Sequence, residues 1–287
     1  MSATVSRFVE VADRVWVARY PWFDVNVTLV GGDGGLVVVD THGSTRAGSE
    51  VVEDVRRLGV GDVTAVVNTH EHFDHVFGND AFLSAYGTLP VHAHEVAAEQ
   101  TLVSAEATRA RYAEDPDDPH AAEVLETRVV PADHTFSSVR VLELGDRRLE
   151  LLHLGRGHTG GDLVVHVPDA DVVLAGDLVE ESGPPAFGEE SFPLDWPFTL
   201  DQLIGLTGPA TRVVPGHGAL VDRAFVEAQR ADLGTVAQQI HELAAEGVPV
   251  DRALEARAWP FPTSALSRAM RAGYAQLPRE ARGLPLA

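Results

Sequence analysis

Hydrophobic residues recur with two different periods along the chain, and each period predicts one kind of element. Short runs rich in valine and leucine, bounded by glycine or proline, are typical of strands. They predict strands at residues 14–20, 25–30, 35–40, 63–67, 90–92, 138–144, 147–154, 162–167, 171–175 and 212–214. Apolar residues at helical spacing predict helices at residues 44–59, 76–86, 97–113, 200–206 and 223–247.

Groups of strands and groups of helices alternate along the chain, without an internal repeat. This order predicts an α+β protein with two sheets, each covered by helices on one face. We expect one domain over residues 1–247 and a C-terminal helical extension over residues 248–287, packed on the same domain. The sequence of the extension is compatible with a lid, a packing arm or a dimer contact.

The charged residues exclude several classes of function. The chain has 43 acidic and 22 basic residues, a formal net charge of −21. A surface of this charge repels a phosphate backbone, so we expect no nucleic-acid partner. All the basic residues are arginine, and without lysine neither Schiff-base chemistry nor a P-loop lysine is available.

Two further absences narrow the chemistry and the location. The chain has no cysteine, so any metal must be held by histidine, aspartate or glutamate. No segment is apolar over the length that a membrane span needs, and the N-terminal residues lack the pattern of a signal peptide. We therefore expect no membrane partner and a cytoplasmic location.

A dense polar segment follows the predicted strand at residues 63–67. Residues 70–75 read His-Glu-His-Phe-Asp-His and place three imidazoles and a carboxylate in one short turn. If the chain is extended there, His70 and His72 point to the same side and can reach one metal ion. Asp74 and His75 then lie where a second ion could be held. A helical H-E-x-x-H zinc site is excluded, because it would need histidine at position 74.

Three later polar residues each follow or end a predicted strand and are flanked by glycine. They are His158, Asp177 and His217. Loops after strands often carry functional groups, and glycine allows the backbone to approach closely. These residues are the candidates to complete a metal site begun by residues 70–75.

The ordered set of polar residues resembles the metallo-β-lactamase superfamily of hydrolases, over roughly residues 10–240. The resemblance implies a four-layer αβ/βα sandwich with two zinc ions, or iron or manganese in their place. His70, His72 and His158 would hold the first ion, Asp74, His75 and His217 the second, and Asp177 would bridge them. Asp40, at the end of a predicted strand, matches a buried aspartate beneath the metal site; a helix cap or turn is the competing interpretation.

Two departures from the family's sequence patterns indicate which branch of the superfamily the chain resembles. Class B β-lactamases of the cysteine-containing type have a thiolate where this chain has Asp177, so the chain looks more like the glyoxalase II, lactonase and general hydrolase branches. A glycine replaces the usual proline in the segment from His158 to Asp162, which we expect to be harmless.

The catalytic and substrate-binding candidates follow from the implied chemistry. Asp74 would orient the attacking water and pass on its proton, and Asp40 would fix the orientation of a ligand. The aromatic residues Trp22 and Phe23 would form a flap over the metals, with core packing an equal alternative. The remaining candidates for substrate contact are Arg156, where a structural salt bridge competes, and Trp196 in a second aromatic loop.

The predicted function is zinc-dependent hydrolysis of a small ester, thioester, lactone or amide, with weak β-lactamase activity compatible. Three alternatives stay open at this point. They are an iron-dependent oxidoreductase of the same fold, similar to sulfur dioxygenases, a nuclease, which the net charge disfavours, and a non-catalytic metal-binding module. The expected partners are a small-molecule substrate and a second copy of the chain in a homodimer.

Overall fold

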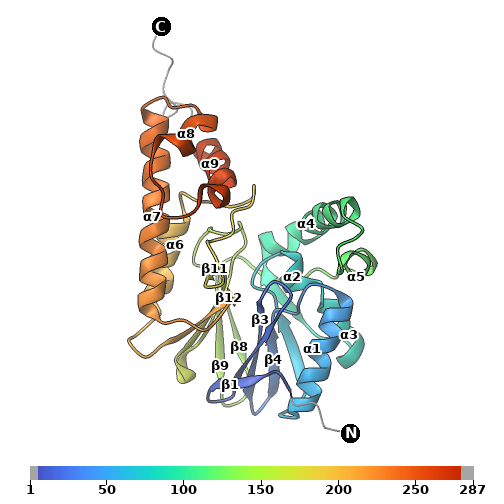
Figure 1. Cartoon of the computed structure of the whole chain (residues 1–287). Helices are drawn as coiled ribbons and strands as arrows, with labels where there is room; N and C mark the ends of the chain where they lie inside the picture. The colour runs from blue at the N-terminus through green and yellow to red at the C-terminus, as the bar shows by residue number, and fades with distance from the viewer. Residues whose placement is uncertain (1–5, 279–287) are drawn as a thin grey trace.

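The computed structural model describes residues 6–278, and its strands form one continuous hydrogen-bonded path (Figure 1). The order along the path is β7-β6-β5-β4-β3-β12-β11-β10-β9-β8, with β2 also on β3 and β1 on β2. The strands are β1 (Val9–Ala12), β2 (Val15–Tyr20), β3 (Val25–Gly32), β4 (Gly35–Val39), β5 (Val63–Val67), β6 (Val91–His94), β7 (His134–Phe136), β8 (Val139–Glu143), β9 (Arg148–Leu152), β10 (Val164–Val167), β11 (Val172–Glu180) and β12 (Arg212–His217).

The path folds back on itself into two facing sheets. Its two halves are joined at β3 and β12 by a single residue pair, Val25 and His217. Alternate residues of β4 face opposite sides, so that Val37 joins the apolar cluster between the sheets and Val38 joins the cluster beneath the outer helices. The inner cluster also contains Leu174 of β11, so the two halves share one core.

Helices cover the outer face of each sheet, which confirms the predicted αβ/βα sandwich. The helices are α1 (Thr45–Leu58), α2 (Phe73–Val76), α3 (Asn79–Tyr86), α4 (Glu95–Glu114), α5 (Ala121–Glu126), α6 (Trp196–Gly205), α7 (Arg223–Ala245), α8 (Val250–Ala256) and α9 (Thr263–Gln276), with a short 3₁₀ turn, η1, at Pro168–Ala170. Helices α1 and α3 pack on the first half of the path, and α6, α7 and α9 pack on the second. Helix α1 begins with a side-chain cap, since the Ser44 hydroxyl accepts from the Ala47 amide at 2.8 Å.

Three short elements and one helix break differ from the prediction. The strand β1, the helix α5 and the strand β7 have too few residues to show a clear period. The helix predicted at 76–86 is divided into α2 and α3. The division occurs near Gly78, where a Cβ atom would lie 1.8 Å from the Thr41 carbonyl oxygen. Glycine at this position lets the segment after the histidine cluster pack directly on the loop after β4.

The C-terminal helices belong to the outer layer over the second half of the path. Leu266 and Met270 of α9 are fully buried in the same cluster as Val236 and Ile240 of α7. The separation of residues 248–287 as an extension stays a prediction, and residues 279–287 lie outside the described part. No helix within residues 6–278 combines the length and apolar character that crossing a membrane requires.

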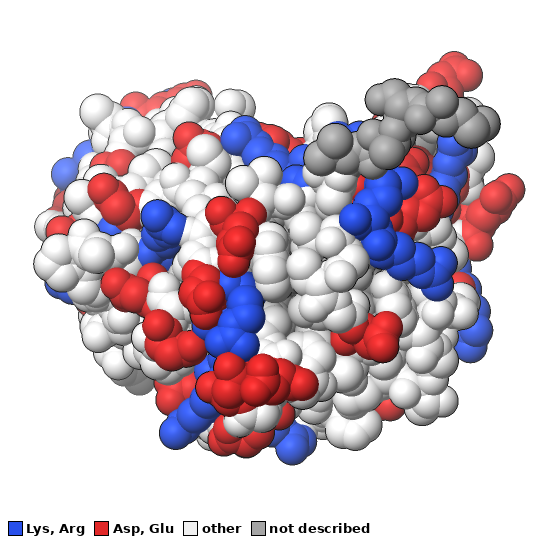
Figure 2. Space-filling view, turned by 90° about the horizontal axis from the view of Figure 1, so that it is seen from below, with Lys and Arg blue, Asp and Glu red and all other residues white. Residues whose placement is uncertain are grey.

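Acidic and basic side chains are interspersed at the end of the molecule away from α4 and α9 (Figure 2). Several arginines near the turns between strands form ion pairs with acidic residues. Arg14 lies 2.7 Å from Asp146, and the buried guanidinium of Arg147 lies 2.8 Å from Asp169. Excess acid therefore provides partners for arginines over much of the described surface.

Candidate metal centre

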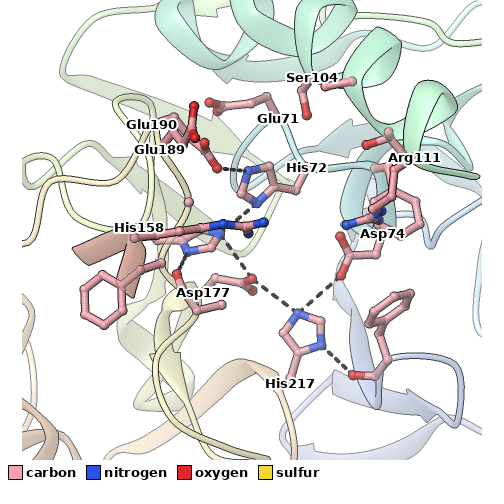
Figure 3. A pocket seen from close by; sticks show the side chains of 18 of the residues that line it. Glu71, His72, Asp74, Ser104, Arg111, His158, Asp177, Glu189, Glu190 and His217 are labelled. Atoms are coloured by element: carbon pink, nitrogen blue, oxygen red, sulfur yellow. Dashed lines mark hydrogen bonds and ion pairs between the residues drawn. The ribbon is translucent and has the colours of Figure 1, made fainter. Parts of the chain in front are cut away.

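Seven predicted residues converge at the edge where β5, β11 and β12 end. Figure 3 shows five of them, His72, Asp74, His158, Asp177 and His217. The donor atoms of the seven residues form two neighbouring groups, each with all atoms within 4.8 Å of one another. The groups are His70, His72, His158 and Asp177, and Asp74, His75 and His217. Asp177 contacts both, since its Oδ2 lies 3.4 Å from His158 Nε2 and its Oδ1 lies 3.1 Å from His75 Nε2.

Asp40 lies beneath the first segment of the site in an uncommon backbone conformation. It directly follows β4 and has φ of +62°, which aspartate tolerates better than most side chains. One carboxylate oxygen accepts from the Thr69 amide at 2.8 Å. The other accepts from the Thr69 hydroxyl and from His75 Nδ1, each at 2.8 Å. Asp40 therefore fixes the ring of His75 directly and that of His70 through Thr69, whose hydroxyl lies 3.0 Å from His70 Nδ1.

Hydrogen bonds to backbone carbonyls fix the tautomers of two further histidines. His158 Nδ1 donates to the Ala186 carbonyl at 2.8 Å, and His217 Nδ1 donates to the Phe23 carbonyl at 2.7 Å. A carbonyl oxygen only accepts, so Nδ1 carries the proton and Nε2 of the neutral ring is bare. In both residues the bare nitrogen points at Asp177.

His72 has the opposite orientation. Its Nε2 lies 2.9 Å from a Glu190 oxygen, while its Nδ1 faces His158 Nε2 at 2.8 Å. A carboxylate accepts, so Nε2 of His72 carries a proton and Nδ1 is the nitrogen turned inward. Glu190 thus gives His72 the outer partner that metal-ligating histidines usually have.

The inward-facing atoms lack the donors that would satisfy them. Nε2 of His75 lies 3.3 Å from Nε2 of His217. Both His70 Nε2 and Asp177 Oδ1 are buried, and neither has a hydrogen-bond partner in the described part of the chain. Bare nitrogens and carboxylate oxygens facing one another are costly unless cations lie among them. Imidazole and carboxylate suit zinc, iron and manganese, so the donor set fits divalent metal ions.

The charges in the centre act on each other through close contact. Burial would raise the pKa of Asp177, but His217 and His75 outweigh it and hold that pKa well below its usual range. Burial opposes a charge on His217, yet Asp177 raises its pKa to about 10. Burial lowers the pKa of His158 to about 4. The carboxylates therefore make the centre attractive to positive charge, whether carried by protons or by metal ions.

A family model described as the metallo-beta-lactamase superfamily matches residues 20–217. The chain belongs to this superfamily. Because the family binds metal ions, the two groups of histidine and aspartate residues are its metal-binding candidates in this chain. The fold predicted from the resemblance is thereby confirmed.

Individual relatives are similar at low identity. The chain is 26% identical over 194 residues to a metallo-beta-lactamase type 2 of Bacillus cereus, covering 67% of this chain and 66% of the relative, just under two thirds. It is 28% identical over 211 residues to an acyl-coenzyme A thioesterase of Bos taurus, covering 67% of this chain and 72% of the relative. A solved structure of the sec-alkyl sulfatase PisA1 aligns with a TM-score of 0.74 at 18% identity, covering 94% of this chain and 50% of the other.

A cavity of about 870 Å³ opens above the two groups. His72, Asp74, His158, Asp177 and His217 form what we call the floor of the cavity. Its wall comes from the loop after β2, from α4, from residues 182–190 after β11, and from α9. The metal-binding candidates are thus accessible to a small molecule.

Of the four predicted substrate contacts, Phe23 is the one that lines this cavity. Its ring is 46% exposed, and its backbone has φ of +60° in the turn between β2 and β3. The same residue supplies the carbonyl that holds His217. This turn therefore links the cavity wall to the floor.

The other three predicted substrate contacts, Trp22, Arg156 and Trp196, do not line the cavity, and their role in substrate binding stays a prediction. Trp22 stacks on His120 with ring centroids 3.9 Å apart, so the packing alternative holds. Arg156 pairs with Asp195 at 2.5 Å, which is the structural salt bridge. Trp196, the first residue of α6, is fully buried.

The buried position of Trp196 has a structural role. Its indole nitrogen donates to the Leu178 carbonyl in β11 at 3.1 Å. The ring thereby holds the backbone next to Asp177. Aromatic content alone did not distinguish this role from a pocket wall, because both positions favour a large ring.

Several residues of the cavity were missed in the sequence. Glu190 had no motif, and its contact with His72 depends on the path of the loop after β11. Arg111 and Arg268 lie in helices and looked like ordinary surface arginines. Helical spacing could have placed them on the exposed faces, but it could not have shown that both faces border one cavity.

Proposed function

We propose that the chain is a zinc-dependent hydrolase that cleaves a small ester, thioester, lactone or amide in this cavity. One observation carries the proposal: five histidines turn bare nitrogens toward two neighbouring points, and Asp177 reaches both groups. The thioesterase activity named for the Bos taurus relative and the lactamase name of the Bacillus cereus relative support carbonyl hydrolysis.

The proposed ligand assignment follows the two groups. His70, His72 and His158 hold one ion, and Asp74, His75 and His217 hold the other, with Asp177 shared between them. Zinc at such sites supplies Lewis acidity, which polarises a carbonyl group and lowers the pKa of water to about 7.

The residues of the chain supply orientation and proton transfer. Asp74 lies on the cavity floor with Oδ2 3.4 Å from His217 Nε2, which leaves its second oxygen to orient an attacking water and accept its proton. Asp40 keeps His75 in the tautomer that turns Nε2 inward. Phe23 covers one side of the cavity and excludes water from the reacting carbonyl.

The test is an activity panel on protein with quantified metal. Purified chain would be assayed with ester, thioester, lactone and β-lactam substrates, before and after chelation and after return of zinc, iron or manganese. We expect about two zinc ions per chain, turnover of a carbonyl substrate, and its loss and recovery with chelation and zinc. Turnover that persists after complete removal of metal, or oxygen uptake with iron as the native metal, would contradict the proposal.

A further inference from the structure

Two arginines on the cavity wall have no acidic partner within residues 6–278. Arg111 of α4 and Arg268 of α9 both line the cavity. Among residues 6–278, neither lies within ion-pair distance of a carboxylate, although the chain has 43 acidic residues for 22 arginines. Arginines elsewhere, such as Arg128 and Arg230, do pair with acids. The two guanidinium groups in the cavity therefore keep their hydrogen-bonding capacity for a ligand.

Aromatic rings hold the Arg111 guanidinium while leaving its hydrogen-bonding edge unused. Its central carbon lies 5.4 Å from the centroid of the Phe73 ring and 5.3 Å from that of Tyr112. A cation placed over a ring face is attracted to it and still directs its N–H groups sideways. Figure 3 shows the Arg111 side chain extending from α4 into the cavity on the side of Asp74.

Arg268 is presented by a helix whose other face is anchored. Leu266 and Met270 are fully buried against the core, and the amide of Gln276 donates to the Ser191 carbonyl at 2.8 Å. Ser191 in turn donates through its hydroxyl to the carbonyl of His158 at 2.6 Å. The C-terminal helix is thus fixed relative to the cavity floor, and Arg268 occupies a defined part of the wall.

The acids of the cavity restrict where an anion can bind. Glu190 is occupied by His72, and Glu180 accepts from the Ser182 hydroxyl at 2.6 Å. Glu114 and Glu189 also line the wall and would repel an anion placed beside them. Within the cavity wall, a negative group is therefore favoured at Arg111 and Arg268. Phe23 and the 60% exposed Val103 also line the cavity and offer apolar surface.

We propose that the substrate carries an anionic group remote from the scissile bond, and that Arg111 and Arg268 bind it. The group is a carboxylate, sulfate or phosphate, and the apolar part of the substrate contacts Phe23 and Val103. Arg111 and Arg268 are then specificity-determining residues, and the C-terminal extension contributes to the active site. This inference depends on the proposed hydrolase function for the identity of the reaction.

Paired substrates that differ in one charge test the inference. Para-nitrophenyl pentanoate and the para-nitrophenyl monoester of glutarate have acyl chains of equal length, and the second ends in a carboxylate. We expect the zinc-loaded chain to hydrolyse the glutarate ester with kcat/KM at least about tenfold higher. Arg111→Ala and Arg268→Ala should each lower kcat/KM for that ester by about tenfold, since tenfold corresponds to about 1.4 kcal/mol, below the usual contribution of a charged hydrogen bond. Both variants should keep kcat/KM for the pentanoate ester within about twofold of that of the unmodified chain.

The matched control is Arg271→Ala. Arg271 lies one turn after Arg268 on α9, is exposed, and does not line this cavity. The variant should therefore leave kcat/KM unchanged for both esters. Equal kcat/KM for the two esters in the unmodified chain, or equal losses on both esters in the two cavity variants, would overturn the inference while leaving hydrolase function intact. The para-nitrophenyl ester of 4-phosphonobutanoate, in which a phosphonate replaces the terminal carboxylate of glutarate, would show whether a phosphorus oxyanion also binds at the arginines.

A binding measurement covers the case in which neither ester is hydrolysed, which would count against the proposed function. Calorimetric titration of the zinc-loaded chain compares glutarate, which has two carboxylates, with pentanoate, which has one. We expect glutarate to bind about tenfold more tightly, with the difference abolished in Arg268→Ala and in Arg111→Ala and kept in Arg271→Ala. Equal affinities for the two acids in the unmodified chain would overturn the inference.

Discussion

On the cavity floor each imidazole has its outer nitrogen held by a second group, whereas the side chains of the wall have few such constraints. His158 and His217 donate to backbone carbonyls, and His72 donates to Glu190. Phe23 and Arg111, by contrast, are exposed and held by ring contacts. The floor is therefore suited to fixed chemistry, and the wall can change its recognition without disturbing the metal-binding candidates.

The largest expected effect comes from removing the residue shared by both groups of the floor. Asp177→Ala deletes the carboxylate that contacts His75, His158 and His217. We expect bound metal to fall below two ions per chain and turnover to fall by more than the roughly 10–100-fold typical of losing an outer partner. Metal analysis and kcat on the folded variant measure this, and unchanged values for both would contradict the shared role.

Asp40→Asn tests the residue that orients the rings of His75 and His70. Asparagine also tolerates the positive φ of this position, so the change leaves the backbone in place. The amide nitrogen of asparagine would replace a carboxylate oxygen that accepts a hydrogen bond from Thr69 or from His75. We expect the affinity for metal to drop about 10–100-fold. Competition with a chromogenic chelator gives the affinity. An affinity equal to that of the unmodified chain would mean that the tautomer of His75 does not depend on this carboxylate.

Gln276→Ala tests whether the C-terminal helix stabilises the floor as well as the wall. Its amide reaches Ser191, which supports the loop bearing the outer partners of His72 and His158. Loss of one hydrogen bond, about 1 kcal/mol, predicts a metal affinity lowered by up to about fivefold. Gln239→Ala is the control, because that amide joins α7 to the Ala258 carbonyl instead. Equal effects of the two variants would show a general loss of packing.

The smallest expected effect on metal binding and turnover comes from an imidazole buried away from the floor, whose burial concerns stability. Burial lowers the pKa of His92 on β6 to about 4 from 6.5, and its Nδ1 has no hydrogen-bond partner among the described residues. Since the folded state favours neutral His92, its contribution to stability is complete above pH 6.5 and is lost as the pH falls toward 4. We expect His92→Phe to reduce the acid dependence of the unfolding free energy in metal-free protein. Denaturant unfolding at several pH values between 4 and 6.5 measures this dependence. An unfolding free energy that falls equally steeply with pH in the variant and in the unmodified chain would refute the prediction.

The sequence predicted most of the floor because its residues form motifs within short segments or directly after strands. Short valine-rich runs defined the strand that precedes His70 and the strand that ends at His217, and glycines marked the close approaches around them. The helix break at Gly78 depends on contact with Thr41, which lies far away in the sequence and has no local signal.

The wall was predictable only in part, because its residues come from elements distant in sequence. Phe23 stood out as an aromatic residue in a turn, but Trp196 had the same appearance and lies in the core. Arg111 and Arg268 border one cavity only because α9 packs back over the loop after β11. Tertiary contacts of this kind leave no periodic pattern in the sequence.

The shared role of Asp177 is tested most directly by locating the metal ions. Anomalous diffraction at the zinc edge from crystals of the zinc-loaded chain would place each ion relative to its ligands. The account predicts two ions, one about 2.0–2.2 Å from donors of His70, His72 and His158 and one at similar distances from Asp74, His75 and His217, with Asp177 bound to both. A single ion, or two ions with the Asp177 carboxylate bound to neither, would contradict it.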